Sequence, residues 1–285
     1  MKNYFLGANS ADGFYSLYDG FCPSGGGNFL WILKGGPGCG KSTFMKTIAA
    51  AAENAGLAVE RVWCSGDPDS LDGVFIPAKK VGYMDGTAPH AMEPRFPAAD
   101  SLCLDLGQFY DVDAIRPLLP QIRELYGQYK SCYRRAYQLL SAASEKIVPA
   151  LWQRQTPACF CRAITCRGLV DLIESDPIPV TRKELDDLAQ SAVSRGTRVL
   201  DLRSPLHPLR SEGILLEEDG LCYRCSEEAL SLPAVFEELR EAKRLHDLLE
   251  SVYHPHVDFA GVEKFAGNHC KKLNLDCKIG KNVVE

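Results

Sequence analysis

Short apolar runs alternate with amphipathic stretches along the chain, a pattern typical of α/β proteins. Residues 29–33 (Phe-Leu-Trp-Ile-Leu) predict a buried strand, and residues 42–55, with apolar side chains at helical spacing, predict the helix that follows it. Gly56 comes directly after this helix, as a C-terminal cap would. Further strands are predicted at residues 58–64 and 81–85. This order of elements favours a parallel sheet flanked by helices.

Two longer amphipathic segments follow. Residues 111–146 and 236–253 each carry an apolar stripe at helical spacing, which indicates helices packed against a core. Residues 271–285 are polar without a core pattern, so we expect a flexible tail there.

The segment between the first strand and its helix reads Gly-Gly-Pro-Gly-Cys-Gly-Lys-Ser at residues 35–42, here called the glycine loop. It fits the phosphate-binding loop pattern, in the strand–loop–helix context that the motif requires. Glycines let backbone N–H groups turn towards phosphate oxygens, and the helix N-terminus adds partial positive charge. Lys41 supplies a full charge, and Ser42 offers a hydroxyl ligand to Mg²⁺. The expected nucleotide-binding residues form one run: Gly35, Gly36, Pro37, Gly38, Cys39, Gly40, Lys41, Ser42 and Thr43.

Polar residues at two strand ends are candidates for the chemistry. Asp85 ends an apolar strand downstream of the glycine loop, so we expect it to hold Mg²⁺ together with Ser42, directly or through water. Asp67 also follows a strand and is the alternative metal ligand, although it could instead only form an Asx turn. His90 lies in the loop after Asp85, where it could reach a γ-phosphate or a second substrate, or serve only as a loop hydrogen-bonder. Asp67, Asp85 and His90 are therefore the candidate catalytic residues.

Composition and charge narrow the class of protein. The 285 residues suffice for one large or two ordinary domains, and 46% hydrophobic with 24% charged residues is typical of a soluble globular chain. A net charge of −5 gives no electrostatic reason to expect nucleic acid or an anionic membrane as a partner. The chain shows no membrane-spanning run and no signal-peptide architecture, so we expect a cytoplasmic location.

Twelve cysteines raise the question of a zinc site. They include two local groups: Cys159, Cys161 and Cys166, and Cys222 with Cys225. Residues 221–225 predict a strand, on which positions three apart face opposite sides, and this disfavours a shared ion. In a reducing compartment these thiols need not pair. A further histidine-rich set lies near the C-terminus, and its prolyl turn and exposed setting predict that it binds no metal: His246, His254, His256 and Asp258.

The second half of the chain repeats the first at an offset of 140 residues, taken from Gly56 and Gly196 (196 − 56 = 140). At this offset residues 43–55 of the predicted helix fall on residues 183–195 and the strand before it on residues 169–173. Residues 4–8 match residues 159–163 at an offset of 155. This repetition indicates a duplicated unit. We predict three regions: a nucleotide-binding domain at 1–150, a degenerate α/β repeat at 155–270 and the flexible tail at 271–285.

The second unit lacks the chemistry of the first. Residues 175–182 fall on the glycine loop, but Thr181 replaces the lysine and Arg182 the metal-binding serine. Pro179 has no N–H to offer a phosphate, and the β-branched Val180 resists a positive φ. We therefore expect one nucleotide per chain, with the degenerate half as a packing partner or as a docking surface for another protein.

Three motifs together resemble a poorly characterised family of P-loop ATPase-like proteins from Gram-positive bacteria. They are residues 32–43, the run Cys-Ser-Gly-Asp-Pro-Asp-Ser-Leu-Asp-Gly at 64–73, and Asp-Gly-Thr-Ala-Pro-His at 85–90. Residues 244–250 and 257–259 are similar to the C-terminal segment of the family, more weakly. Members commonly carry two phosphate-loop halves, whereas this chain has a degenerate second half. The resemblance implies a P-loop NTPase-like fold and leaves the biological role open.

The leading hypothesis is Mg²⁺-dependent binding and hydrolysis of ATP. Lys41 and the loop amides would hold the phosphates, Ser42 and Asp85 the metal, and Asp67 or His90 the attacking water. A second hypothesis is phosphoryl transfer to a small molecule or nucleotide, with Asp67 as base. A third is a non-catalytic nucleotide sensor or adaptor that docks a partner. ATP is preferred to GTP because the chain lacks a guanine-reading Asn/Thr-Lys-x-Asp motif, and the oligomeric state is not predicted.

Overall fold

The computed structural model describes residues 3–22, 26–144, 162–172, 178–195, 199–201, 213–216, 222–225 and 232–276, and every structural statement below concerns these residues. None of the helices in these ranges is long and apolar enough to cross a membrane.

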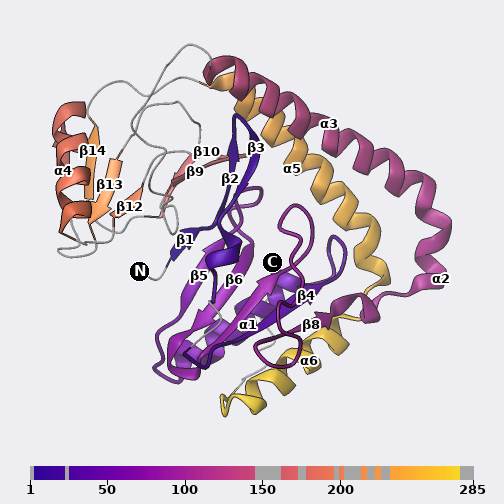
Figure 1. Cartoon of the computed structure of the whole chain (residues 1–285). Helices are drawn as coiled ribbons and strands as arrows, with labels where there is room; N and C mark the ends of the chain where they lie inside the picture. Colours follow the sequence, from indigo (N-terminus) through magenta and orange to yellow (C-terminus); the bar gives the residue numbers. More distant parts are fainter. Residues whose placement is uncertain are drawn as a thin grey trace.

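A six-stranded sheet lies at the centre of the first half (Figure 1). In spatial order its strands are β1 (Asn3–Phe5), β5 (Glu60–Trp63), β6 (Leu71–Ile76), β7 (Val81–Asp85), β4 (Phe29–Lys34) and β8 (Ser101–Asp105). The pairs β1–β5, β7–β4 and β4–β8 are parallel, whereas β6 runs antiparallel to both of its neighbours. The prediction of a parallel sheet is therefore wrong at β6. Short connections join β6 to β5 and β7, and short connections can join only antiparallel neighbours.

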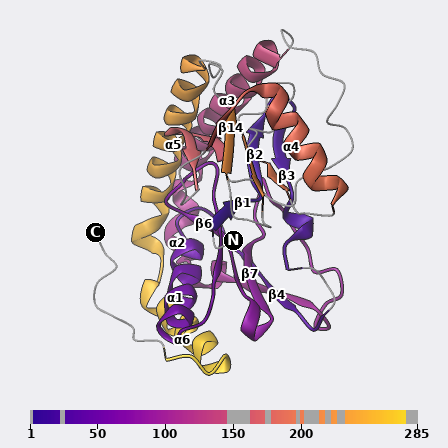
Figure 2. The ribbon, with the colours of Figure 1, turned by 90° about the vertical axis from the view of Figure 1, so that its left-hand side faces the viewer.

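Two helices cover one face of this sheet. The predicted helix is α1 (Lys41–Asn54), and beside it lies α6 (Phe259–Lys272), which the sequence did not predict (Figure 2). Both helices contribute to the main apolar core, α6 through Val262, Ala266 and Cys270, which are spaced four residues apart along one helical face. Leu275 is also buried in this core, so the predicted tail boundary at residue 271 falls inside an ordered, packed segment. Residues 277–285 of the predicted tail lie outside the described residues.

A long helical hairpin runs along the molecule (Figures 1 and 2). After α2 (Val112–Ile115) and η4 (Arg116–Leu118) comes α3 (Leu119–Ser144), and its partner is α5 (Pro233–Tyr253). The helices are antiparallel, because Arg135 pairs with Glu238 while Tyr129, earlier in α3, contacts His246, later in α5. The C-terminal end of α5 thereby reaches the glycine loop, where η5 (His254–His256) connects it to α6.

The second half repeats part of the topology of the first, four of its six sheet strands. Its elements are β11 (Ile178–Val180), α4 (Arg182–Ser194), β12 (Val199–Asp201), β13 (Gly213–Leu216) and β14 (Cys222–Cys225). The sheet order β11-β14-β13-β12 reproduces β4-β7-β6-β5, with the same parallel and antiparallel pairs. The offset of 140 residues places α4, β13 and β14 on their counterparts, but it misplaces the strand before the helix. Residues 168–171 form β10 in a separate hairpin, and β11 occupies the position that β4 has in the first sheet.

Two matching hairpins join the halves. The hairpin of β2 (Gly7–Ser10) and β3 (Gly13–Ser16) falls on that of β9 (Arg162–Thr165) and β10 (Gly168–Asp171) at the offset of 155. The turns share a bond from a side-chain hydroxyl to a glycine carbonyl: Ser10 donates to Gly13 at 2.7 Å, and Thr165 donates to Gly168 at 3.0 Å. The two glycines have φ of 103° and 98°. The Asn9 amide donates to the Ile164 carbonyl at 2.8 Å and connects the hairpins directly.

Candidate functional site

The glycine loop forms a tight turn between β4 and α1, at the carboxyl ends of the parallel strands. Gly38 and Gly40 have φ of 68° and 85°, in the left-handed region that favours glycine. A β-carbon at Gly38 would lie 3.0 Å from the His254 ring and 3.3 Å from the Glu250 carbonyl oxygen, so a larger residue has no room there. Helix α1 begins at Lys41, and no side chain caps its N-terminus. Its first N–H groups are therefore of the kind that binds anions.

Lys41 lies over the loop that precedes it. Its Nζ donates to the carbonyl oxygens of Gly35 and Gly36, both at 2.9 Å, and lies 3.7 Å from Oδ2 of Asp85. The Lys41 and Asp85 side chains are 12% and 14% exposed. The structure thus brings together two residues that the sequence assigned to the site. Burial raises the pKa of the Cys39 thiol, so the loop carries no thiolate that would repel a phosphate.

Ser42 and Asp85 keep oxygen atoms available for a cation. Ser42 Oγ accepts a hydrogen bond from the Leu71 N–H at 2.9 Å, and a hydroxyl oxygen has a second lone pair. Asp85 Oδ1 accepts from the N–H and the hydroxyl of Thr87 at 2.8 and 2.6 Å, which fixes the carboxylate at the end of β7. A hydroxyl and a carboxylate are ligands that suit Mg²⁺. The residues present therefore fit the metal that the motif implies.

Asp67 lies farther from the loop in the sheet, after β5, with β6 and β7 between that strand and β4. It accepts from the Ser70 hydroxyl at 2.8 Å and from the Asp69 N–H at 3.3 Å, the Asx-turn geometry that the sequence left open. It also lies 3.6 Å from Nζ of Lys243 in α5. The loop that carries Asp67 leads to Leu71, whose N–H is hydrogen-bonded to Ser42 of the glycine loop.

His90 is an internal partner of Asp72, which sequence reasoning did not select as a site residue. His90 is 8% exposed, and its Nε2 lies 3.5 Å from Asp72 Oδ2, which also accepts from the Tyr18 hydroxyl at 2.6 Å. Burial lowers the pKa of His90, but the Asp72 carboxylate more than offsets this and the pKa is raised. Burial alone would raise the pKa of Asp72. The His90 ring and the hydrogen bonds to the carboxylate outweigh this effect, so the pKa of Asp72 lies below its ordinary value. The pair is therefore buried, and each partner favours the charged form of the other.

Sequence reasoning missed three contacts to the glycine loop, two of them from the C-terminal half. The Gly38 N–H donates to Oε1 of Glu250, in the last turn of α5, at 3.1 Å. Tyr110, which follows η3 (Leu106–Phe109), donates from its hydroxyl to the Pro37 carbonyl at 2.8 Å. Phe259, the first residue of α6, lies beside Gly40. No local pattern in the sequence signals these contacts.

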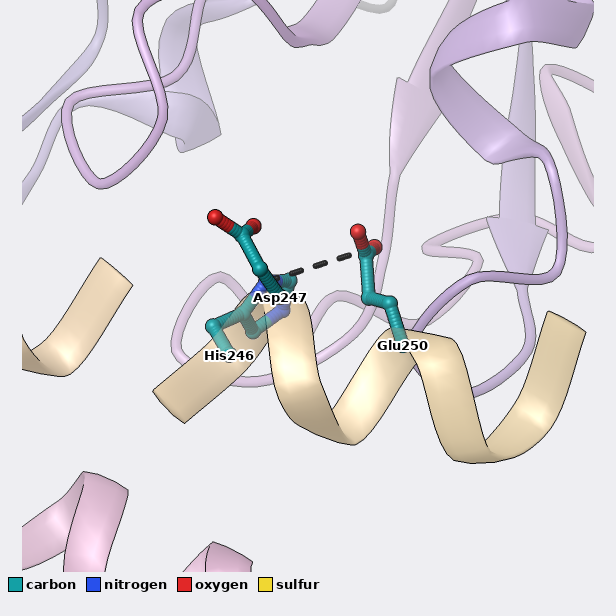
Figure 3. A group of neighbouring side chains, drawn as sticks. All are labelled: His246, Asp247 and Glu250. Carbon is teal, nitrogen blue, oxygen red and sulfur yellow. Dashed lines mark ion pairs between the residues drawn. The ribbon is translucent and has the colours of Figure 1, made fainter. Parts of the chain in front are cut away.

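One group of side chains among the described residues has the geometry to hold a metal ion: His246, Asp247 and Glu250 (Figure 3). Their ligand atoms lie within 4.8 Å of one another. Two of them have other partners, because Glu250 accepts from the Gly38 N–H and Asp247 pairs with Lys243. His246 thus lies with these carboxylates, and not with the two later histidines of the set named from the sequence. We assign no metal to this group.

The cysteines considered for zinc are only partly described. Cys166 is a buried free thiol, and residues 222–225 form the predicted strand as β14. Cys159 and Cys161 lie outside the described residues.

The counterpart of the glycine loop in the second half is a single residue. Only Thr181 separates β11 from α4. Its N–H and hydroxyl both donate to a Glu184 carboxylate oxygen at 2.7 Å, and the Glu184 N–H in turn faces the Thr181 hydroxyl at 3.4 Å. This is a capping box, which satisfies the start of the helix with the chain's own side chains. The N-terminus of α4 therefore lacks a glycine loop, and its capping side chains already bind the N–H groups of Thr181 and Glu184.

Comparison of the chain with models of known protein families, with curated proteins and with solved structures gives no match. The case for the site rests on the loop sequence and on the contacts around it.

Proposed function

We propose that the glycine loop binds the phosphates of a nucleoside triphosphate, ATP by preference, together with Mg²⁺, and that the protein hydrolyses it. The observation that carries this proposal is the position of Lys41. Its ammonium group lies at the uncapped N-terminus of α1, between the loop carbonyls and Asp85. A positive charge, glycine N–H groups and a helix N-terminus at one point favour a polyphosphate.

Each residue has a distinct part in the proposed reaction. The loop N–H groups and Lys41 would bind the β- and γ-phosphates, and Lys41 would stabilise charge on the phosphoryl group as it is transferred. Ser42 and Asp85 would hold Mg²⁺, which neutralises phosphate charge when bound. Asp67 would orient the attacking water from the loop that contacts Ser42. His90 would act indirectly, by holding Asp72 next to Leu71.

A nucleotide-dependent switch is a second candidate function, and one contact favours it. The bond between Gly38 and Glu250 ties the glycine loop to α5, the helix that runs alongside α3 to the second half (Figure 1). A bound phosphate would compete for the same N–H group. Nucleotide occupancy would then be sensed by the helical hairpin, with or without hydrolysis.

The proposed function is tested by calorimetric titration with a slowly hydrolysed ATP analogue and Mg²⁺, and by assaying ATP turnover for free phosphate. We expect one nucleotide per chain, because the second half presents a capping box where the first has the glycine loop. We also expect phosphate release without an added acceptor, which distinguishes hydrolysis from phosphoryl transfer. A stoichiometry near two per chain, with one site surviving Lys41→Ala, would contradict the single-site prediction. The absence of any binding would refute the proposed function.

Glu250→Gln should tighten nucleotide binding. The substitution removes a carboxylate that repels phosphate and competes for the Gly38 N–H. A hydrogen bond to a charged group contributes about 1.5 kcal/mol, so we expect an affinity gain of about tenfold. Titration of MgATP into both variants measures it. Glu237→Gln, on an exposed position of the same helix, is the matched control. Weaker binding by Glu250→Gln would mean that Glu250 supports the loop and does not compete with phosphate.

A further inference from the structure

A cavity of about 420 Å³, open to solvent, lies near the glycine loop, between the segment after β8 and the segment before α6. Its lining residues come from two short stretches: Gln108, Phe109, Tyr110 and Asp111, and Pro255, His256, Val257 and Asp258. Backbone hydrogen bonds hold these stretches together, from Asp111 N to His256 O at 2.8 Å and from Asp258 N to Phe109 O at 2.9 Å. The volume falls within the range of small-molecule sites, roughly 300–1,000 Å³.

Tyr110 connects the cavity to the glycine loop. Tyr110 lines the cavity, and its hydroxyl donates to the Pro37 carbonyl. The strand before it, β8, is the direct neighbour of β4 in the sheet, so the chain leaves both strands at the same edge. On the other side, Asp258 lines the cavity, and the next residue, Phe259, lies beside Gly40. A ligand whose phosphates lie in the loop would therefore extend directly towards this cavity.

The chemistry of the lining selects a donor-rich, uncharged group. Asp111 and Asp258 each use one carboxylate oxygen to cap a helix, from Ala114 N at 3.0 Å and from Gly261 N at 2.9 Å. Their other oxygens remain acceptors, and their negative charge disfavours a second anion. Gln108 adds an amide and His256 an imidazole, beside the apolar surfaces of the remaining residues. Ribose hydroxyls and the exocyclic amine of a base are donors of the kind that these carboxylates accept.

We propose that this cavity binds the nucleoside part of the triphosphate whose phosphates the glycine loop holds. The proposal rests on the function proposed for that loop, and it adds a second subsite with its own recognition chemistry. The loop binds the polyphosphate common to all nucleotides, and the cavity distinguishes a nucleotide from free polyphosphate.

The test compares two ligands, MgATP and magnesium tripolyphosphate, which has no nucleoside. Calorimetric titration gives the affinity of wild type and variants for each ligand. Gln108→Trp fills the cavity from an exposed position, and Gln128→Trp makes the same change at an exposed position of α3 as a control. His256→Ala removes one polar side chain of the lining and tests the cavity without adding bulk. Melting temperatures establish that each variant is folded.

We expect wild type to bind MgATP at least about tenfold more tightly than tripolyphosphate, a difference of about 1.4 kcal/mol. Gln108→Trp should abolish most of this preference, and His256→Ala should abolish part of it. Both variants should keep the wild-type affinity for tripolyphosphate. The control Gln128→Trp should bind both ligands as wild type does. Equal affinities of wild type for the two ligands would overturn the proposal. So would cavity variants that keep the preference, or that weaken both ligands equally. If neither ligand binds wild type, or if binding survives Lys41→Ala, the proposed function itself fails, and the assignment of the cavity fails with it.

Discussion

Lys41→Ala should lower the affinity for MgATP by at least about 100-fold. The substitution removes the ammonium group that lies at the N-terminus of α1 in contact with the glycine loop. Two hydrogen bonds to charged phosphate oxygens, at about 1.5 kcal/mol each, contribute about 3 kcal/mol, which corresponds to about two orders of magnitude in affinity. The fold should persist, because Lys41 is not part of the apolar core beneath the loop. Titration with a fluorescent ATP analogue, with a melting curve for each protein, measures both effects.

Lys264→Ala is the matched control for this variant. It removes the same charge from an exposed position on α6, the helix that packs beside α1. We expect its affinity to equal that of wild type, because the loop contacts are intact. Unchanged affinity in Lys41→Ala as well would refute the assignment of the glycine loop to phosphate binding.

Asp85→Asn should reduce turnover by about 100-fold or more, since a correctly held metal contributes several kcal/mol to stabilising the transition state. Binding should fall much less, because the amide keeps the shape of the side chain and the loop is unchanged. The Thr87 hydrogen bonds accepted by Oδ1 can be retained by the amide oxygen. Turnover measured across a series of Mg²⁺ concentrations should show a higher Mg²⁺ requirement.

Asp67→Asn separates the two candidate metal ligands. Asp67 lies in an Asx turn and pairs with Lys243, so we expect its substitution to leave the Mg²⁺ requirement close to that of wild type. The opposite pattern, with Mg²⁺ dependence lost in Asp67→Asn and unchanged in Asp85→Asn, would mean that Asp67 and not Asp85 is the metal ligand.

Local patterns predicted the elements around the glycine loop well. The predicted strand at 29–33 is β4 (Phe29–Lys34), and the predicted helix at 42–55 is α1 (Lys41–Asn54). The direction of β6 was mispredicted, although its short connections to β5 and β7 already favour antiparallel neighbours. Helix α6 was missed because its buried face includes small residues and it contains Gly261 and Gly267, which weaken helix propensity.

In the candidate site, too, some residues could be placed from the sequence and others could not. Lys41 and Asp85 could be placed together from sequence because a loop and the end of the neighbouring strand share one sheet edge. Glu250 contacts Gly38 across 212 residues, and Tyr110 contacts Pro37 across 73. Such contacts depend on how α5 and the end of β8 pack, which no local spacing encodes. The pairing of His90 with Asp72 was hidden for the same reason, since only the sheet brings the two together.

The position of α6 has a consequence for how the protein is made. Val262, Ala266 and Cys270 cover α1, yet a ribosome adds Val262 long after Lys41, which lies 221 residues earlier in the chain (262 − 41 = 221). A nascent chain that stops at residue 150 leaves the side of α1 that faces α6 uncovered and the loop without Glu250 and Phe259. The first half therefore cannot complete its core during its own synthesis. Until α6 has been synthesised and has packed against α1, the apolar surface that it covers is exposed, and exposed apolar surface promotes aggregation.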